Sequence, residues 1–342
     1  MLSVDAMGGD SAPGMAVAGC DLAQERHPFV EFLLFGDEAQ VAPLVAATRY
    51  LKKTARIVHT SDFVAGDAKP AIALRSGRKS SMRLAIDAVR DGEAAGIVSA
   101  GNTGALMAMA KFVLKTLPGI DRPAIASLFP TTRGESVMLD LGANVQCDTD
   151  NLVQFAIMGE VFARSVLGLA QPSVGLLNVG SEEMKGHEEL RNAAAWLRDT
   201  HLPIRFHGFV EGDDVPAGTV DVVVTDGFTG NIALKIAEGT SKLYSGFLKG
   251  AFSSSFMAKI GYLFAQSALK KVRLRTDPRR YNGAMFVGLN GIVVKSHGGT
   301  DALGFANALG VAVDMITHGL NDKIREELAH LAPPPSPQLA TG

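Results

Sequence analysis

The chain has 342 residues, of which 47% are hydrophobic and 20% are charged, and its formal net charge is −2. These values are typical of globular proteins, so a disordered, collagen-like or fibrous chain is excluded, and the length suits one or two α/β-sized units. The two cysteines, Cys20 and Cys147, lie far apart in the sequence. They indicate neither a disulfide framework nor a zinc knuckle, and a reducing cytosol is the expected compartment.

The N-terminal residues carry neither a basic region nor an apolar core of a signal peptide, and no run of eighteen apolar residues occurs. We therefore expect no cleaved leader and no transmembrane helix, and a cytoplasmic protein that is soluble or peripheral to a membrane. Glycine contributes 37 residues, about 11%, against a usual ~7%. Glycine without a collagen period indicates many tight turns between strands and helices.

Short runs rich in Val, Ile and Leu alternate with segments of helical periodicity along the chain. The alternation predicts an α/β fold, a three-layer α/β/α sandwich with a mainly parallel sheet, in a single catalytic domain over 1–331. A flexible Pro-rich tail is expected over 332–342. The predicted strands are 2–6, 30–35, 56–59, 96–99, 125–129, 137–141, 174–178, 221–225 and 292–295. The predicted helices are 13–26, 80–91, 103–116, 150–167, 188–199, 230–249 and 301–331.

The first candidate site is the turn after the predicted strand 96–99. Free N–H groups at a helix N-terminus, with glycines that let a ligand approach, form a natural cradle for phosphate or an oxyanion. A tight turn without a ligand is the alternative, but such a turn does not need two polar residues at its tip. The candidate residues are Ser99, Gly101, Asn102, Thr103 and Gly104.

Two further strand-to-helix turns carry polar side chains. In the turn after 221–225, Asp226 is a candidate to orient a base or a cation, and Asn231 is a candidate oxyanion donor. Alternatively, Thr229 simply caps the following helix. After 292–295, Lys295 is a candidate phosphate ligand and His297 a candidate general acid or base, or a structural histidine. Gly227 and Gly230 are further candidates in the turn after 221–225.

The segments 139–144 and 178–187 are a fourth and a fifth polar strand end, with Asn144 and Lys185 as candidates. Ligands bind beyond the carboxyl ends of parallel strands, so we expect all five turns to lie at one edge of the sheet. The N-terminal segment 5–10 adds Asp5, Gly8 and Gly9 as candidates.

Several familiar motifs are absent. The sequence contains no G-x-x-x-x-G-K-[ST], no G-x-S-x-G and no convincing G-x-G-x-x-G after a strand. His187 and Glu188 begin a zincin motif, but Arg191 stands where its second histidine would be. We expect an anion-binding α/β enzyme without a metal or cofactor.

The segment 244–280 concentrates positive charge, with eight basic residues and one acidic residue, a balance of +7. Over 244–275, large apolar residues alternate with the basic ones, which suits either a membrane interface or a second subunit. We expect this segment to project as helices, and we expect no nucleic-acid partner. The candidate contact residues are Phe252, Phe256, Lys259, Leu263, Lys270, Lys271, Arg273 and Arg275.

Taken together, these motifs resemble the phosphate acyltransferase (PlsX) family of bacterial phospholipid synthesis over about residues 2–321. The resemblance implies transfer of a long-chain acyl group from acyl carrier protein (ACP) to inorganic phosphate, giving acyl phosphate for a membrane acyltransferase. It further implies the phosphotransacetylase and isopropylmalate dehydrogenase architecture, a homodimer and peripheral membrane association. The motifs are VDAMGGD, KP followed by ALRSGRKSSM, SAGNTGALMA, DRPAIA, LDLGANV, NVGSEEMKG, FVEGDD, VTDGFTGN and GLNGIVVKSHGG.

From these family positions we form a hypothesis for the site. Phosphate binds the 101–104 amides with help from Lys185, Asn231 lies near the oxyanion, and His297 deprotonates or orients phosphate with Asp226 as its support. Phosphate attacks the thioester directly, because a thiolate leaves readily.

Other interpretations remain open at this point. Cys147 is interpreted as a small buried thiol rather than as an acyl-enzyme nucleophile. The competing functions are a phosphotransacetylase acting on short acyl-CoA, an NAD-dependent decarboxylating dehydrogenase and a membrane scaffold without catalysis.

Overall fold

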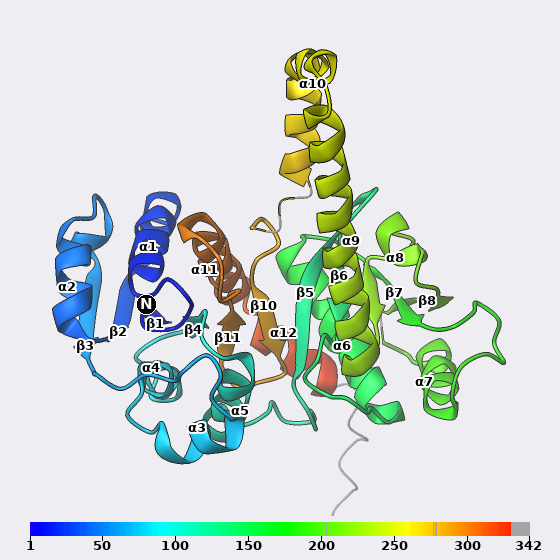
Figure 1. Ribbon diagram of the computed structural model, residues 1–342. Helices are drawn as coiled ribbons and strands as arrows, with labels where there is room; N and C mark the ends of the chain where they lie inside the picture. The colour runs from blue at the N-terminus through cyan, green and yellow to red at the C-terminus, as the bar shows by residue number, and fades with distance from the viewer. Residues whose placement is uncertain (203, 276, 278, 330–342) are drawn as a thin grey trace, which may run out of the picture.

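The computed structural model describes residues 1–202, 204–275, 277 and 279–329. The described residues form an 11-stranded sheet in the order β3-β2-β1-β4-β11-β10-β5-β6-β9-β7-β8, with helices on both faces (Figure 1). The predicted α/β class with a mainly parallel sheet is confirmed. The strands are β1 (Leu2–Asp5), β2 (Phe32–Gly36), β3 (Ala55–His59), β4 (Gly96–Ser99), β5 (Ala124–Thr131), β6 (Gly134–Leu139), β7 (Ser173–Leu177), β8 (Arg205–Val210), β9 (Val222–Val224), β10 (Ala284–Val287) and β11 (Ile292–Lys295).

Helices pack on both faces of the sheet (Figure 1). The α-helices are α1 (Gly14–Arg26), α2 (Glu38–Ala46), α3 (Pro70–Ser76), α4 (Ser81–Arg90), α5 (Thr103–Leu114), α6 (Thr149–Val166), α7 (Glu188–Asp199), α8 (Asp214–Ala217), α9 (Gly227–Ser253), α10 (Phe256–Arg275), α11 (Ala302–Thr317) and α12 (Leu320–Ala329), with one 3₁₀ turn, η1 (Leu51–Lys53). Successive strand residues point to opposite faces, so Leu34 and Val98 belong to the core cluster that contains residues of α1, α6 and α11, whereas Leu33 and Ile97 belong to the cluster that contains residues of α4 and α5.

The sheet consists of two parallel sets of strands that run in opposite directions. Strands β3, β2, β1, β4 and β11 are parallel, and so are β6, β9, β7 and β8. Between them, the pairs β11–β10, β10–β5 and β5–β6 are all antiparallel. Because each antiparallel pair reverses the strand direction, three such pairs in a row leave the two parallel sets running in opposite directions. The carboxyl ends of β1, β4 and β11, here called the Asp5 edge, therefore lie at the opposite sheet edge from those of β6, β9 and β7, the Asp140 edge.

The prediction that the five polar turns share one edge is consequently wrong. The turns after β4 and β11 belong to the Asp5 edge, and those after β6, β7 and β9 belong to the Asp140 edge. The sequence prediction also missed β8, β10, α2, α3 and α8. The helix predicted over 301–331 divides instead at Gly319, which takes a positive φ of 62° between α11 and α12. The predicted tail over 332–342 lies outside the described residues.

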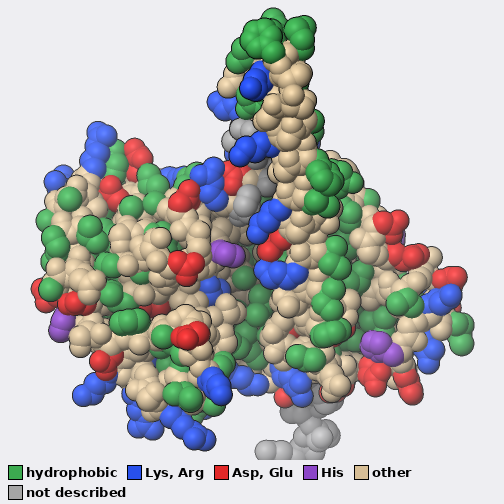
Figure 2. All heavy atoms as spheres, in the orientation of Figure 1, with side chains coloured by type: hydrophobic (Ala, Val, Ile, Leu, Met, Phe, Trp, Pro, Cys, Tyr) green, Lys and Arg blue, Asp and Glu red, His purple; other side chains and the backbone are tan. Residues whose placement is uncertain are grey.

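Helices α9 and α10 project together from the sheet (Figure 1). The rings of Phe252 and Tyr262 meet edge to face, with their centroids 5.5 Å apart, and join the two helices near the turn. Large apolar side chains are exposed there, including Phe256 (77%) and Phe264 (85%), and Figure 2 shows apolar groups at the tip with Lys and Arg along the shaft.

Among the described residues, no helix is by itself long and apolar enough to cross a membrane. The bent pair α11 and α12 reaches that length and composition only together, across a 48° bend.

Candidate functional site

At the Asp5 edge, a buried carboxylate shapes the turn that leads into α5. Oδ1 of Asp5 accepts a hydrogen bond from Ser81 Oγ at 2.6 Å, and Oδ2 accepts one from Ser99 Oγ at 2.7 Å. Ser99 Oγ in turn accepts from the backbone N–H of Gly101 at 3.0 Å. Burial raises the pKa of Asp5, and the two serine hydrogen bonds oppose that rise. The carboxylate thus holds the 99–101 backbone through one intervening hydroxyl.

The glycines of the first loop are required by close contacts with this carboxylate. A Cβ on Gly8 would lie 2.5 Å from Oδ2 of Asp5 and 2.7 Å from the backbone nitrogen of Gly101. Gly9 adopts a φ of +108°, which side chains rarely tolerate. The loop after β1 is therefore pressed directly against the turn after β4.

The first turn of α5 presents backbone donors to solvent. Asn102 caps the helix: its Oδ1 accepts from Ala105 N at 2.8 Å, and its Nδ2 donates to the carbonyl of Gly66 at 2.7 Å. The N–H groups of Thr103 and Gly104 fall in the turn that has no intrahelical acceptors, and both residues are exposed. Within the predicted cradle, the amide of Gly101 binds Ser99 Oγ, whereas those of Thr103 and Gly104 lie on exposed residues.

Lys295 places a buried amine below this turn. Its side chain is almost entirely enclosed, and Nζ donates to the carbonyl of Ala100 at 3.3 Å and to that of Ser296. Burial lowers the pKa of Lys295 to about 8, although the nearby carboxylates of Asp5 and Asp10 act in the opposite direction. An amine with this pKa is mostly protonated at neutral pH, so it adds positive charge beneath the α5 N-terminus.

His297 follows β11 directly and is exposed beside these groups. Its backbone N–H donates to Asn282 Oδ1 at 2.9 Å, and its Nδ1 accepts from the backbone N–H of Gly299 at 3.1 Å. Asn282 also donates to Ser296 Oγ at 2.8 Å. Asn282 is a site-shaping residue that the sequence did not indicate, because it lies 15 positions before His297 and belongs to no local motif.

At the Asp140 edge, another buried aspartate organises the loop after β6. Oδ1 of Asp140 accepts from the backbone N–H groups of Ile125, Gly142 and Ala143, and Oδ2 accepts from the backbone and side-chain nitrogens of Asn144. Asn144 Nδ2 also donates to the carbonyl of Pro123. Burial raises the pKa of Asp140, against these hydrogen bonds. The amide of Asn144 is therefore committed to the loop, and the sequence prediction missed Asp140 itself.

The start of α9 packs against this loop. Asp226 is the N-cap: its two carboxylate oxygens accept from Thr229 N and Thr229 Oγ1, each at 2.8 Å, so the alternative that Thr229 itself caps the helix is wrong. Gly227 N donates to the Asn144 carbonyl at 2.7 Å, and a Cβ on Gly230 would collide with the Asp140 carbonyl oxygen. Close packing explains both glycines.

The separation of the two edges corrects two parts of the hypothesis. Asp226 does not support His297, because it caps α9 at the Asp140 edge. Lys185 is exposed in the loop between β7 and α7, where its carbonyl accepts from Asn178 Nδ2 at 3.2 Å, and so belongs to the same edge rather than to the 101–104 turn. Asn231 is exposed there too, beside Gly142.

A groove of about 1050 Å³ opens at the Asp140 edge. Its polar lining comes from the ends of β7 and β9 and from the loop before α6, and it includes Arg122, Cys147, Asn178, His187, Asp226 and Thr229. Among the described residues, no group of three or more His, Cys, Asp and Glu side chains could hold a metal ion.

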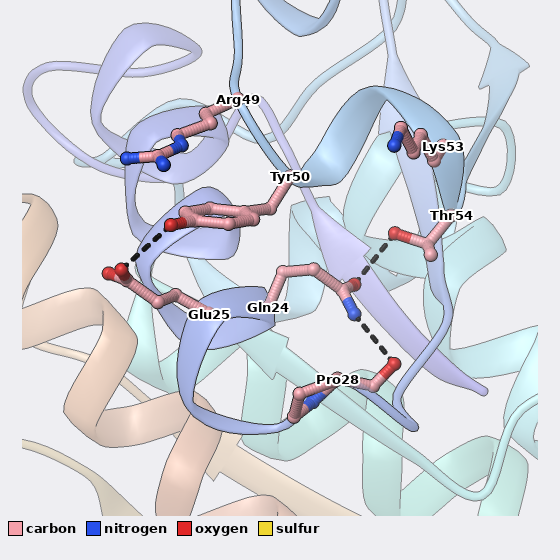
Figure 3. Close-up of a pocket in the computed structure, with 7 residues that line it drawn as sticks. All are labelled: Gln24, Glu25, Pro28, Arg49, Tyr50, Lys53 and Thr54. Carbon is pink, nitrogen blue, oxygen red and sulfur yellow. Dashed lines mark hydrogen bonds between the residues drawn. The ribbon is translucent and has the colours of Figure 1, made fainter.

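A smaller hollow, about 300 Å³, lies between α1 and η1 (Figure 3). Its side chains largely satisfy one another: Tyr50 OH donates to Glu25 at 2.9 Å, and Thr54 Oγ1 donates to Gln24 at 2.7 Å. The cations Arg49 and Lys53 also line this hollow.

Comparison with known proteins identifies the family. The family described as "Fatty acid synthesis protein" matches residues 1–323. A phosphate acyltransferase from Rhodospirillum centenum is 68% identical over 330 residues, covering 96% of this chain and 93% of the relative. One from Paramagnetospirillum magneticum is 66% identical over 344 residues, covering 100% and 98%. The chain belongs to the phosphate acyltransferase family. This confirms the family predicted from the motifs.

Solved structures support the fold of this phosphate acyltransferase. A phosphotransacetylase from Streptococcus pyogenes superposes with a TM-score of 0.60 at 15% identity, covering 92% of this chain and 93% of that one. A 4-hydroxythreonine-4-phosphate dehydrogenase from Klebsiella pneumoniae gives a TM-score of 0.53 at 14% identity, with coverage of 92% and 99%. At such identities the likeness concerns the fold alone, which is the predicted architecture.

In this chain, Cys147 is poorly suited to carry an acyl group. Its Sγ lies 3.8 Å from the carbonyl of Asn144, and burial, followed by the charges of Asp140 and Asp226, raises its pKa to about 12. A thiolate is the nucleophilic form, so little of it exists at neutral pH. Cys147 packs against the core but is half-buried and lines the groove, so the predicted burial is only partial, and its raised pKa is the argument against an acyl-enzyme nucleophile.

Proposed function

We propose that this phosphate acyltransferase transfers a long-chain acyl group from ACP to inorganic phosphate, forming acyl phosphate for phospholipid synthesis. The cradle at the Asp5 edge carries the proposal. There the exposed amides of Thr103 and Gly104 lie at a helix N-terminus, with the buried amine of Lys295 below. Backbone donors, a helix dipole and one cation suit a small, doubly charged anion.

In the proposed reaction, an oxygen of hydrogen phosphate attacks the thioester carbonyl carbon. The new carbon–oxygen bond forms, the carbon–sulfur bond breaks, and the electron pair of that bond leaves with sulfur. The proton of hydrogen phosphate ends on the departing thiolate, so acyl phosphate and free ACP thiol are the only products. Because the proton balance closes, catalysis depends chiefly on positioning and on stabilising the oxyanion.

The candidates of the Asp140 edge take a different place in this proposal. Lys185 and Asn231 are exposed there, after strands that run opposite to those that lead into the phosphate cradle. We assign them to binding the acyl donor at a distance from its reacting thioester carbonyl. Substituting either residue should therefore raise the KM for acyl-ACP more than the KM for phosphate.

The projection formed by α9 and α10 supports membrane and subunit contacts. Phe256, Leu263 and Phe264 are exposed near its tip, and Lys259, Lys270 and Lys271 are exposed along α10. Apolar groups that enter the lipid interface beside cations that meet anionic headgroups favour peripheral binding, and so a cytoplasmic protein at the membrane surface. Exposed Leu243 and Phe247 on α9 offer a face to a second copy of the chain in a homodimer. Of the other predicted contact residues, Arg275 is exposed, and the side chain of Arg273 lies outside the described residues.

The test of the proposal is thiol release from long-chain acyl-ACP, with and without phosphate, beside the same assay on acetyl-CoA. Phosphate-dependent release from acyl-ACP alone is the expected result. Release only from acetyl-CoA would indicate a phosphotransacetylase, and release from neither would contradict both. Co-pelleting of the protein with anionic and with neutral vesicles tests the membrane contact. The molecular mass of the protein in solution tests the dimer contact separately.

A further inference from the structure

The ring of His297 is held in a way that specifies which nitrogen carries its proton. Nδ1 accepts a hydrogen bond from the backbone N–H of Gly299, two residues further along, at 3.1 Å. A ring nitrogen that accepts must present its lone pair, so the neutral ring carries its proton on Nε2. Nε2 is therefore a donor.

The surrounding structure fixes this orientation from both sides. The backbone N–H of His297 donates to Asn282, and the buried Asn282 amide donates to Ser296 Oγ, so the chain before the ring is anchored. The backbone N–H of Asp10 donates to the carbonyl of Gly298 at 2.9 Å, which anchors the chain after it. Among the described residues, none accepts a hydrogen bond from Nε2 of His297, and the side chain is exposed.

We propose that His297 acts as a hydrogen-bond donor through Nε2 to an anionic oxygen of the reacting groups, and not as a general base; this rests on the proposed function. A base would need the lone pair on Nε2, which places the proton on Nδ1, pointing at the N–H of Gly299. The proposed reaction needs no such base, because its proton passes from phosphate to the departing sulfur. A fixed donor beside the cradle instead stabilises the charge that develops on oxygen.

Two substitutions separate the donor from the turn. In His297→Gln the side-chain amide N–H replaces Nε2–H, but the acceptor for Gly299 is lost. In His297→Asn the side-chain oxygen can accept from the N–H two residues on, as in an Asx turn, but no donor reaches the position of Nε2. His297→Ala removes both functions.

The expected kinetic result is a reduction of about 100-fold in kcat/KM for His297→Ala and for His297→Asn, and a reduction of less than about tenfold for His297→Gln. The pH profile of His297→Gln should keep the same acidic limb as that of the parent. The charged groups around His297 are Lys295 on β11, Asp10 after β1, and the Arg279–Asp301 pair, joined at 3.0 Å, beside α11; all of them remain in every variant. Two results would overturn the donor role. One is that the pH profile of His297→Gln loses the acidic limb of the parent, and the other is that His297→Asn is more active than His297→Gln.

A spectroscopic measurement decides the tautomer without reference to turnover. In the full-length protein labelled with ¹⁵N-histidine, His297 should show a protonated Nε2 and an unprotonated Nδ1 when the ring is neutral. Its signals are assigned from their loss in His297→Gln. A protonated Nδ1 would overturn the proposal even in an active enzyme. Absence of phosphate-dependent thiol release by the parent protein would instead contradict the proposed function, while the NMR signals would still decide the tautomer.

Discussion

The Asp5 edge and the Asp140 edge each place a buried aspartate where a strand ends and a glycine-containing loop begins. Asp5 accepts from two serine hydroxyls and reaches the next turn through Ser99. Asp140 instead accepts five hydrogen bonds, four of them from backbone N–H groups. The first arrangement leaves the α5 amides, an amine and an imidazole beside one another, whereas the second uses its donors within the loop.

The difference shows that similar strand-end patterns can serve a ligand or serve the fold. At the Asp140 edge, Gly227 and Gly230 allow a helix to approach a loop. At the Asp5 edge, Gly8 allows one loop to approach another beneath a set of available donors. Substitutions at the Asp140 edge should therefore affect stability most, and substitutions at the Asp5 edge should affect turnover most.

The largest expected effect is on stability at the Asp140 edge. Gly230→Ala would press a methyl group onto the Asp140 carbonyl, a backbone atom with little freedom to move, and should lower the free energy of unfolding by ~3 kcal/mol. Gly239→Ala, on the same helix with nothing within 4 Å, is the matched control and should raise it by about 1 kcal/mol. Urea denaturation measures both; equal effects would mean that this contact does not constrain the helix.

Lys295 tests whether the buried charge at the Asp5 edge lowers the stability of the folded protein. The pKa of Lys295 is about 8 in the folded protein, and the ordinary value of 10.5 applies to the unfolded chain. Between these values the unfolded chain binds more protons, so stability rises with pH. The cost of the buried charge is complete below pH 8 and absent above pH 10.5. Relative to Lys295→Met, the parent should gain on the order of 3 kcal/mol from pH 8 to pH 10.5 in urea unfolding. A difference that stays constant with pH would contradict the buried charge.

Gly8 tests the geometry of the cradle. In Gly8→Ala the new methyl group would displace Asp5 or the Gly101 amide and so shift the turn before α5, and kcat/KM should fall about 100-fold. Gly14→Ala, at the start of α1 with nothing within 4 Å, should leave turnover near that of the parent. The comparison between the edges would fail if Gly8→Ala kept full activity in the phosphate-dependent thiol-release assay.

Cys147 should give the smallest effect. Because its raised pKa keeps the thiol protonated, Cys147→Ala should change turnover less than about threefold. Mass spectrometry of the enzyme mixed with acyl-ACP should find no acyl group on the protein. A trapped thioester that disappears in Cys147→Ala would move the chemistry to the Asp140 edge.

The sequence by itself determined features that depend on neighbouring residues. Short, mainly apolar runs predicted β1, β2, β4 and β7, because a strand covered on both faces needs few polar residues. Polar residues after those runs predicted helix starts, such as Asn102 before α5. The order of the long motifs also identified the family. Apart from the order of the motifs, each of these signals lies within a few positions of the chain.

Tertiary structure alone decided how the strand ends are grouped. The direction of each parallel set depends on β10 and β5, which pair with strands distant in the sequence, and β10 is a four-residue apolar run that the sequence prediction overlooked. For the same reason the roles of Asp140 and Asn282 could not be predicted, since their partners include Ile125 and His297. A local pattern predicts that a polar side chain ends a strand, but only long-range pairing decides which other side chains it meets.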